Sequence, residues 1–300
     1  MNHPGWNEQA MVFGCEGDRL IGIVAAPTTP IDTGVMIIVG GPQYRAGSHR
    51  QFTLLARHLA GDNIASFRFD YRGMGDSEGG ARNFERVDRD IGRAIETFLD
   101  AVPGLSNIVL WGLCDAASAS LLYGHTDPRV TGLILLNPWA YNEPGVARTR
   151  LRHYYARRLF QASFWSKLLS RKLNLGDSVA GVIASARTAI ARTRIHHPND
   201  QQPNNDPVAA AGDSYIQRML SGLKKFTRPI FFILSGNDLT AKQFSDLAQT
   251  DKDWIKALES ANIAQTTIPQ ANHTFSSQKW RDQVSDLTTA FVKNLQNSHP

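Results

Sequence analysis

Two hydrophobic patterns alternate along the chain. Short apolar runs, such as residues 35–39 and 229–234, are typical of strands buried on both faces of a sheet, whereas apolar residues three or four positions apart are typical of helices. The predicted strands are 11–14, 20–26, 35–39, 64–69, 107–111, 130–136, 229–234 and 264–268, and the predicted helices are 52–59, 87–98, 116–123, 241–248, 254–260 and 278–295. This order predicts an α/β fold with right-handed crossovers and a doubly wound, mostly parallel sheet.

The alternation stops after the sixth predicted strand and resumes at residue 229. Residues 139–228 instead show helical spacing, many arginines and a polar stretch at 197–207 that is typical of a loop. We therefore expect a first core part at 1–138, a helical cap inserted at 139–228 and a second core part at 229–300. Together they are expected to form one compact domain with a cap.

Charge follows the same division. The net charge is +5, but residues 139–228 hold 15 Lys and Arg against 5 Asp and Glu, so the cap is basic and the core acidic. No stretch of 18 apolar residues predicts a transmembrane helix, and the N-terminus has no secretory pattern. Two cysteines in such a chain fit a reducing cytoplasm. No residues have metal-ligand spacing, and we expect neither a metal nor another cofactor.

Cys114 lies where a predicted strand meets a predicted helix, in the sequence Gly112-Leu113-Cys114-Asp115-Ala116. Small residues around a nucleophile at such a junction are typical of a nucleophile elbow, although serine is its usual nucleophile and glycine usually follows where Ala116 stands. The start of the helix is expected to favour the thiolate. The alternative is a buried structural cysteine.

Two further residues complete a possible catalytic triad. Asp238 follows the strand predicted at 229–234, and His273 follows the next strand. Nucleophile, acid and histidine in this order are typical of enzymes with such an elbow, in which the carboxylate orients an imidazole that activates the nucleophile. Asp238 could alternatively cap the helix that follows it. Asp246 is a poorer candidate for the acid because it lies within a helical pattern.

An acyl-transfer reaction also needs two backbone N–H groups for the oxyanion. The first is expected at Asp115, the residue after the nucleophile. The second should come from the loop after residues 35–39, where Pro42 has no N–H, so Gly41 is the first choice and Gln43 the second.

The loop Asp70-Tyr71-Arg72-Gly73-Met74-Gly75-Asp76-Ser77-Glu78-Gly79 resembles the D-x-R-G-x-G-x-S-x-G loop of many α/β-hydrolases. We interpret its glycines and Arg72 as structural. More narrowly, segments 40–45, 112–118 and 273–276 resemble the exosortase A system-associated hydrolases of type 1, a bacterial group that accompanies machinery for surface-protein sorting and exopolysaccharide synthesis. The resemblance implies a cytoplasmic hydrolase with an α/β-hydrolase fold. Cysteine in place of serine, shared with dienelactone hydrolases, argues against peptidase activity.

The sequence thus predicts an ester or thioester hydrolase with the triad Cys114, Asp238 and His273. An acyltransferase with the same triad and a non-catalytic binding protein of this fold are the alternatives. The basic and aromatic segment 148–160 has three interpretations: a solvated face, a surface that selects anionic substrates such as acyl conjugates, or a contact with an anionic membrane surface. We expect a small-molecule or acyl-conjugate substrate and no nucleic acid, since no nucleic-acid-binding module is present. The oligomeric state stays open.

Overall fold

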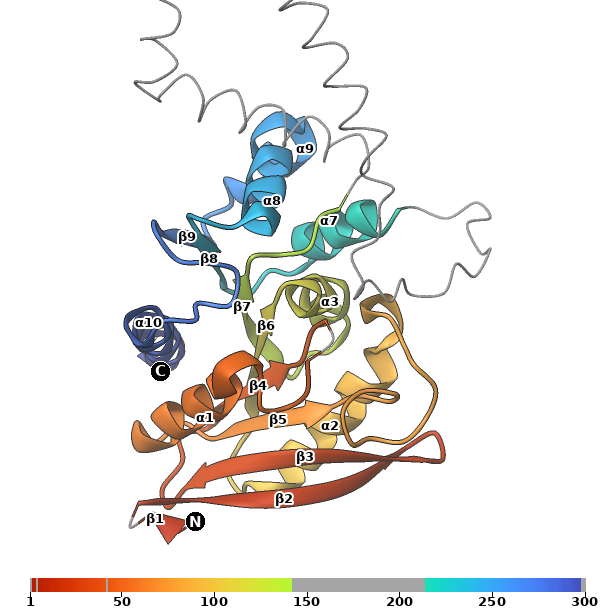
Figure 1. Cartoon of the computed structure of the whole chain (residues 1–300), viewed down its shortest axis with the longest axis vertical. Coiled ribbons are helices and arrows are strands. Elements are labelled where there is room, and N and C mark those ends of the chain that lie inside the picture. Colours follow the sequence, from red (N-terminus) through yellow and green to blue (C-terminus); the bar gives the residue numbers. More distant parts are fainter. Residues whose placement is uncertain (1, 4, 42, 142–213, 298–300) are drawn as a thin grey trace, which may run out of the picture. The chain divides into compact units, whose positions relative to one another are not determined.

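The computed structural model describes residues 2–3, 5–41, 43–141 and 214–297. Within them, one sheet has the strand order β1-β2-β3-β5-β4-β6-β7-β8-β9 (Figure 1). The strands are β1 (Asn2–His3), β2 (Trp6–Cys15), β3 (Asp18–Pro27), β4 (Thr33–Ile38), β5 (Ser66–Asp70), β6 (Asn107–Leu113), β7 (Val130–Leu136), β8 (Ile230–Ser235) and β9 (Ile263–Ile268). The sheet is parallel from β5 to β9 and antiparallel from β1 through β3 to β5. The predicted doubly wound, mostly parallel sheet is confirmed.

Helices cover both faces of this sheet. Helices α1 (Gln51–Gly61) and α10 (Gln278–Asn297) bury their apolar residues in the core on one face. The other face is covered by α2 (Asp88–Ala101), α3 (Asp115–Tyr123), α7 (Tyr215–Lys225), α8 (Leu239–Thr250) and α9 (Lys252–Leu258). None of the helices in the described residues is long and apolar enough to span a bilayer.

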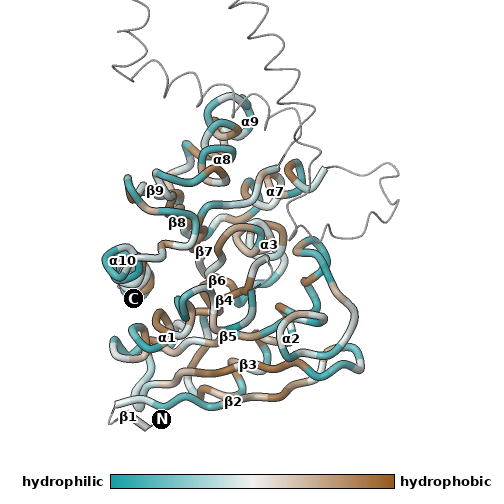
Figure 2. Tube along the Cα trace, in the orientation of Figure 1, coloured by the Kyte–Doolittle hydropathy of each residue, from teal (hydrophilic) through white to brown (hydrophobic). Residues whose placement is uncertain are grey.

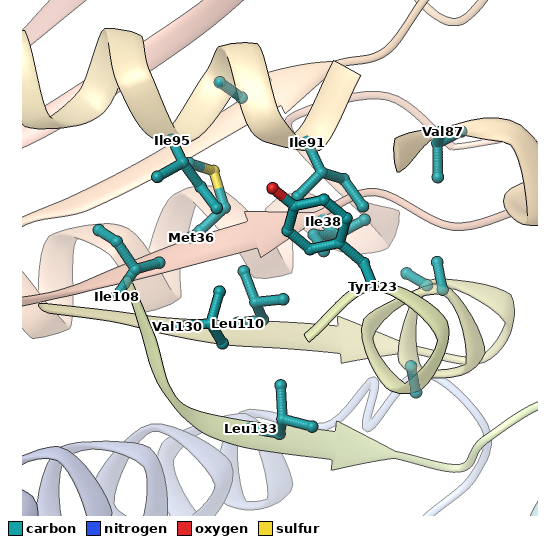
Figure 3. Close-up of a cluster of buried hydrophobic side chains, with 14 of the residues drawn as sticks. Met36, Ile38, Val87, Ile91, Ile95, Ile108, Leu110, Tyr123, Val130 and Leu133 are labelled. Carbon is teal, nitrogen blue, oxygen red and sulfur yellow. The ribbon is translucent and has the colours of Figure 1, made fainter. Parts of the chain in front are cut away.

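The two cores are divided by the alternation of side chains along the strands. In β4, Met36 and Ile38 point to one core and Val35 and Ile37 to the other, because successive side chains of a strand point to opposite faces. Figure 3 shows Met36 and Ile38 in the cluster beneath helix α2. All six residues of β4 are buried, which explains its continuous apolar run, and Figure 2 shows a hydrophobic stretch along β3.

The compact unit that contains the sheet comprises residues 1–142 and 213–300. Residues 139–141 and 214–228, which the sequence pattern groups with the insertion, therefore belong to the same unit as the strands. Helix α7 packs so closely on α3 that a Cβ at Gly222 would lie 2.0 Å from the Leu121 carbonyl oxygen. The rest of the predicted cap, including its basic segment 148–160, lies outside the described residues.

The loop after β5 has the structural role expected from its sequence. Arg72 is 2% exposed, and its guanidinium donates to Asp90 Oδ1 at 2.6 Å and to Glu16 Oε2 at 2.5 Å. Gly73 and Gly75 have φ angles of 73° and 54°, which glycine adopts at low cost. The loop is thereby tied to α2 and to the β2–β3 hairpin.

We expect Arg72→Leu to lower the free energy of unfolding by about 3–5 kcal/mol, because it leaves the fully buried carboxylate of Asp90 without its guanidinium partner. Urea denaturation measures the loss. The matched control is Arg19→Leu, which breaks an exposed pair with Glu78 near the same loop and should change stability little. Equal losses in the two variants would contradict the structural role of Arg72.

Candidate active site

Cys114 occupies a sharp turn between β6 and α3. Its φ and ψ angles are 64° and −124°, a strained conformation for a residue that carries a Cβ. The turn is closed by small residues, since a Cβ at Gly112 would lie 2.5 Å from backbone atoms of Ala116. The Cys114 N–H donates to the Leu136 carbonyl at 2.9 Å, and the Cys114 carbonyl accepts from the Trp139 N–H at 3.1 Å. Cys114 is thus held at the carboxyl edge of the parallel strands, where ligands bind in open α/β sheets.

Asp238 and His273 meet at the same edge. Asp238 Oδ2 accepts from His273 Nδ1 at 2.9 Å and from the Ala241 N–H at 2.9 Å, so it both orients the imidazole and caps α8. The predicted contact between these two side chains is present. Burial raises the pKa of Asp238, but His273 and the N–H groups of Ala241 and Thr240 lower it more, and the net pKa is below the usual value. With Nδ1 bound to a carboxylate, Nε2 carries the lone pair that can accept a proton.

The loops that carry Asp238 and His273 approach each other closely. A Cβ at Gly236 would lie 2.0 Å from the Pro269 carbonyl oxygen, so only glycine fits there. The Gly236 N–H donates to the Ile268 carbonyl at 2.9 Å, and the Asn237 N–H donates to the Ala271 carbonyl at 2.9 Å. These backbone bonds fix the spacing between the acid and the histidine.

Asn137, which the sequence pattern did not single out, connects three parts of the site. It is fully buried, has a φ of 44° and follows β7. Its Nδ2 donates to the His273 carbonyl at 3.0 Å and to Ser235 Oγ at 2.8 Å, while its Oδ1 accepts from the Ser235 N–H at 2.8 Å. Asn137 therefore positions the backbone of His273. An asparagine directly after a buried strand was the only signal in the sequence.

The carboxylate of Asp115 occupies the region expected to bind the oxyanion. Its Oδ2 accepts from the Gly41 N–H at 2.9 Å, and its Oδ1 accepts from the Ala116 N–H at 3.0 Å. Burial raises the pKa of Asp115, with partial opposition from the Gly41 and Ala116 N–H groups. The Gly41 N–H, the first choice for the second oxyanion donor, is thus already bonded to a carboxylate. The Gln43 N–H, the second choice, has no acceptor among the described residues.

The thiol of Cys114 is a weak acid. Burial raises its pKa to about 12, the negative charges of Asp115 and Asp238 add to the rise, and the Asp115 N–H opposes it. The N–H at the start of the helix favours the thiolate, as expected, but burial and two nearby carboxylates outweigh it, so the net pKa is raised. Cys114 is therefore a neutral thiol near pH 7 and needs a base to become a nucleophile.

The site residues share one region, although not all are bonded to each other. The charge of Asp238 helps to raise the pKa of Cys114, and the charge of His273 acts to lower the pKa of Asp115. No hydrogen bond joins Cys114 to His273 in the part of the chain that the structure describes. Such contacts often form only when substrate binds. The described residues also contain no group of three His, Cys, Asp or Glu side chains arranged to hold a metal ion.

The second cysteine has a different setting. Cys15 lies at the end of β2 and is 1% exposed, whereas Cys114 is partly exposed. Burial, together with the charge of Asp90, raises the pKa of Cys15 to about 11. Cys15 is therefore a core thiol that reagents cannot reach without local opening.

Comparisons with known proteins agree with this fold. The sequence matches the family described as Hydrolase_4, serine aminopeptidase, S33, over residues 33–279. The esterase Pf2001 of Pyrococcus furiosus has a TM-score of 0.61 at 13% identity, over 96% of this chain and 93% of that chain. Est1E from Butyrivibrio proteoclasticus, solved with ferulic acid bound, has a TM-score of 0.60 at 17% identity, over 96% and 100% of the two chains. At these identities the solved structures show a shared fold alone. No curated protein has a significant match to the sequence.

We expect Asp115→Asn to speed alkylation of Cys114 by about threefold or more near pH 8, because loss of a neighbouring negative charge lowers the thiol pKa and increases the thiolate fraction. Iodoacetamide labelling with peptide mapping measures the rate. Cys15 is an internal control and should be labelled after Cys114 in both proteins. Asp100→Asn, on the exposed surface of α2, is the matched charge control. An unchanged or slower rate at Cys114 would contradict the effect of Asp115, and earlier labelling of Cys15 would contradict the assignment of Cys114 as the accessible thiol.

Proposed function

Because the chain belongs to the serine aminopeptidase S33 family of α/β-hydrolases, we propose that it hydrolyses esters or thioesters with Cys114 as nucleophile, His273 as base and Asp238 as the acid of the triad. The observation that carries the proposal is the 2.9 Å contact between His273 Nδ1 and Asp238 Oδ2, at the strand edge that also holds the strained turn of Cys114. An oriented imidazole at the same strand edge as an elbow nucleophile has a clear use in acyl transfer.

The raised pKa of Cys114 determines how the first step runs. Since the resting thiol is neutral, His273 Nε2 takes its proton as Sγ attacks the substrate carbonyl. The carbonyl π electrons move to oxygen, and the tetrahedral intermediate then expels the alcohol or thiol, which receives the proton from His273. A thioester acyl-enzyme remains. The carboxylate of Asp238 stabilises the imidazolium that forms in between.

Water completes the reaction by the reverse proton path. His273 accepts a proton from water as its oxygen attacks the thioester carbonyl, and the collapse of this second intermediate releases the carboxylic acid while Cys114 regains its proton. The N–H of Asp115 is one oxyanion donor in both steps. The other is the Gln43 N–H, or the Gly41 N–H after the Asp115 carboxylate has moved away.

The cysteine favours esters and thioesters over peptides as substrates. When a tetrahedral intermediate contains both a cysteine sulfur and an amine, the thiolate leaves more readily than an unprotonated amine, so the intermediate returns to substrate. Alkoxide and thiolate leaving groups compete better with the cysteine. Two proteins of the same fold are described as an esterase and as a protein with bound ferulic acid, which is compatible with this substrate class.

We extend the proposal to the cellular system in which the enzyme acts and to the charge of its substrate. The segments 40–45, 112–118 and 273–276 support a link to exosortase and exopolysaccharide systems through their resemblance to the associated hydrolases. Both cysteines are unpaired thiols, which fits a reducing cytoplasm. The basic segment 148–160 supports an anionic acyl conjugate as substrate, although contact with an anionic membrane surface would use the same charges.

The test is a panel of 4-nitrophenyl esters and acyl thioesters of increasing chain length. We expect Cys114→Ala to abolish the signal, and Asp238→Asn and His273→Ala to lower kcat/KM by about 10²–10⁴-fold, the usual contribution of general base catalysis. Cys15→Ala, which removes the core thiol, is the matched control and should retain activity. Activity that survives in Cys114→Ala would refute the proposed nucleophile.

Product analysis separates the alternatives. Release of the free acid supports a hydrolase, whereas faster turnover and acylated products on addition of alcohols or amines would identify an acyltransferase. A protein that binds the panel but turns over none of it would be a non-catalytic member of the fold.

A further inference from the structure

A cavity of about 380 Å³ is lined by residues of α1, α10, β6 and β7. Arg50, directly before α1, and Gln51, the first residue of α1, line it together with Gln278 and Arg281 of α10. Its apolar wall includes Trp111 of β6. Neither Cys114 nor His273 lines it, so the cavity is separate from the catalytic atoms.

Two polar groups of this cavity lack partners. Gln51 is only 8% exposed, and its Nε2 is shielded from solvent with no hydrogen-bond partner among the described residues. Arg281 Nε is in the same situation. Buried donors in folded proteins are nearly always hydrogen-bonded, because an unmet donor costs free energy. Both nitrogens lie behind the cavity wall, out of reach of a water molecule, so the Gln51 and Arg281 side chains must turn slightly for these free donors to meet an acceptor in the cavity.

The charge of the cavity favours a negative acceptor. Neither Arg50 nor Arg281 forms an ion pair with a carboxylate of the described residues. The carboxylate at the cavity is that of Asp282, which is exposed. His58 also lines it, with Nε2 at 3.4 Å from Asp286 Oδ1 and 3.7 Å from Asp62 Oδ2. The lining has one more positive than negative charge even with His58 neutral.

The N-termini of α1 and α10 strengthen the preference of the cavity for an anion. Residues of the first turns of two helices line the cavity, and neither first turn contains an acidic residue. Helix N-termini carry a partial positive charge that favours anions. Guanidinium groups bind carboxylate and phosphate oxygens through two parallel hydrogen bonds, and an arginine without a carboxylate partner is free to do so.

We propose that this cavity binds the carboxylate or phosphate group of a small anionic molecule, through Arg281, Gln51 and Arg50. The inference does not depend on the chemistry of Cys114. The site is nevertheless close to the catalytic loops, since Phe275 lines the cavity two residues after His273 and has a φ of 50°.

Titration of the full-length protein with inorganic phosphate and with acetate, at constant ionic strength set with chloride, tests the proposal. Calorimetry should detect saturable binding of at least one of the two anions at millimolar or lower concentration, and the anion should raise the unfolding temperature. The tighter of the two identifies the ligand as a phosphoryl or a carboxylate compound. Absence of saturable binding by both anions would overturn the proposal.

The variants assign the binding to this cavity. Arg281→Gln should weaken binding of the anion by about tenfold or more, since it removes the guanidinium group that can form two parallel hydrogen bonds. Arg50→Gln should weaken it as well, and because Arg50 is exposed this variant stays informative if Arg281→Gln does not fold. Lys279→Gln, an equal loss of charge at an exposed position of α10 outside the cavity, should bind as the unaltered protein does. Equal weakening in Arg50→Gln and Lys279→Gln would mean nonspecific electrostatics and would overturn the site.

Discussion

The strained backbone of Cys114 is the constraint on which the candidate active site depends. A residue with a Cβ stays at a φ of 64° only when its surroundings hold it there. Here the close contact of Gly112 with Ala116 and the bonds of the Cys114 backbone to Leu136 and Trp139 supply that restraint. The same interactions fasten α3 to the ends of β6 and β7. The position of the sulfur thus depends on the packing of β6, β7 and α3 rather than on one loop.

Charges around this turn keep the sulfur protonated. Burial and the carboxylates of Asp115 and Asp238 raise the pKa of Cys114 to about 12, so the resting site does not hold a thiolate–imidazolium pair. The proposed catalysis through Cys114 would then resemble that of a serine hydrolase, in which the base removes the proton during attack. The Asp115 carboxylate has a second consequence, since it engages the Gly41 N–H that an oxyanion would otherwise use. In the proposed mechanism, a substrate either displaces this carboxylate or uses the Gln43 N–H.

The sequence predicted those features that depend on a local hydrophobic pattern or on the order of the strands. Continuous apolar runs predicted β4 and β8, and the contact between Asp238 and His273 followed from their places after two neighbouring parallel strands. The direction of the Asp115 side chain could not be predicted, because it depends on where the loop that contains Gly41 lies relative to the start of α3. Asn137 was missed for a similar reason: its bonds join residues about 100 or more positions apart. The pKa of the Cys114 thiol depends on how burial, nearby charges and a backbone hydrogen bond balance, and the sequence alone does not show this balance.

The central claim is that Cys114 carries the acyl group during turnover. Rapid acid quenching of the protein after mixing with an activated ester, followed by mass spectrometry of the intact chain and its peptides, tests this most directly. We predict one added acyl mass, located on the peptide that contains Cys114 and formed much more slowly when His273 is replaced by alanine. An acyl group on another residue, or turnover with no adduct at any quench time together with unchanged turnover in Cys114→Ala, would contradict the account.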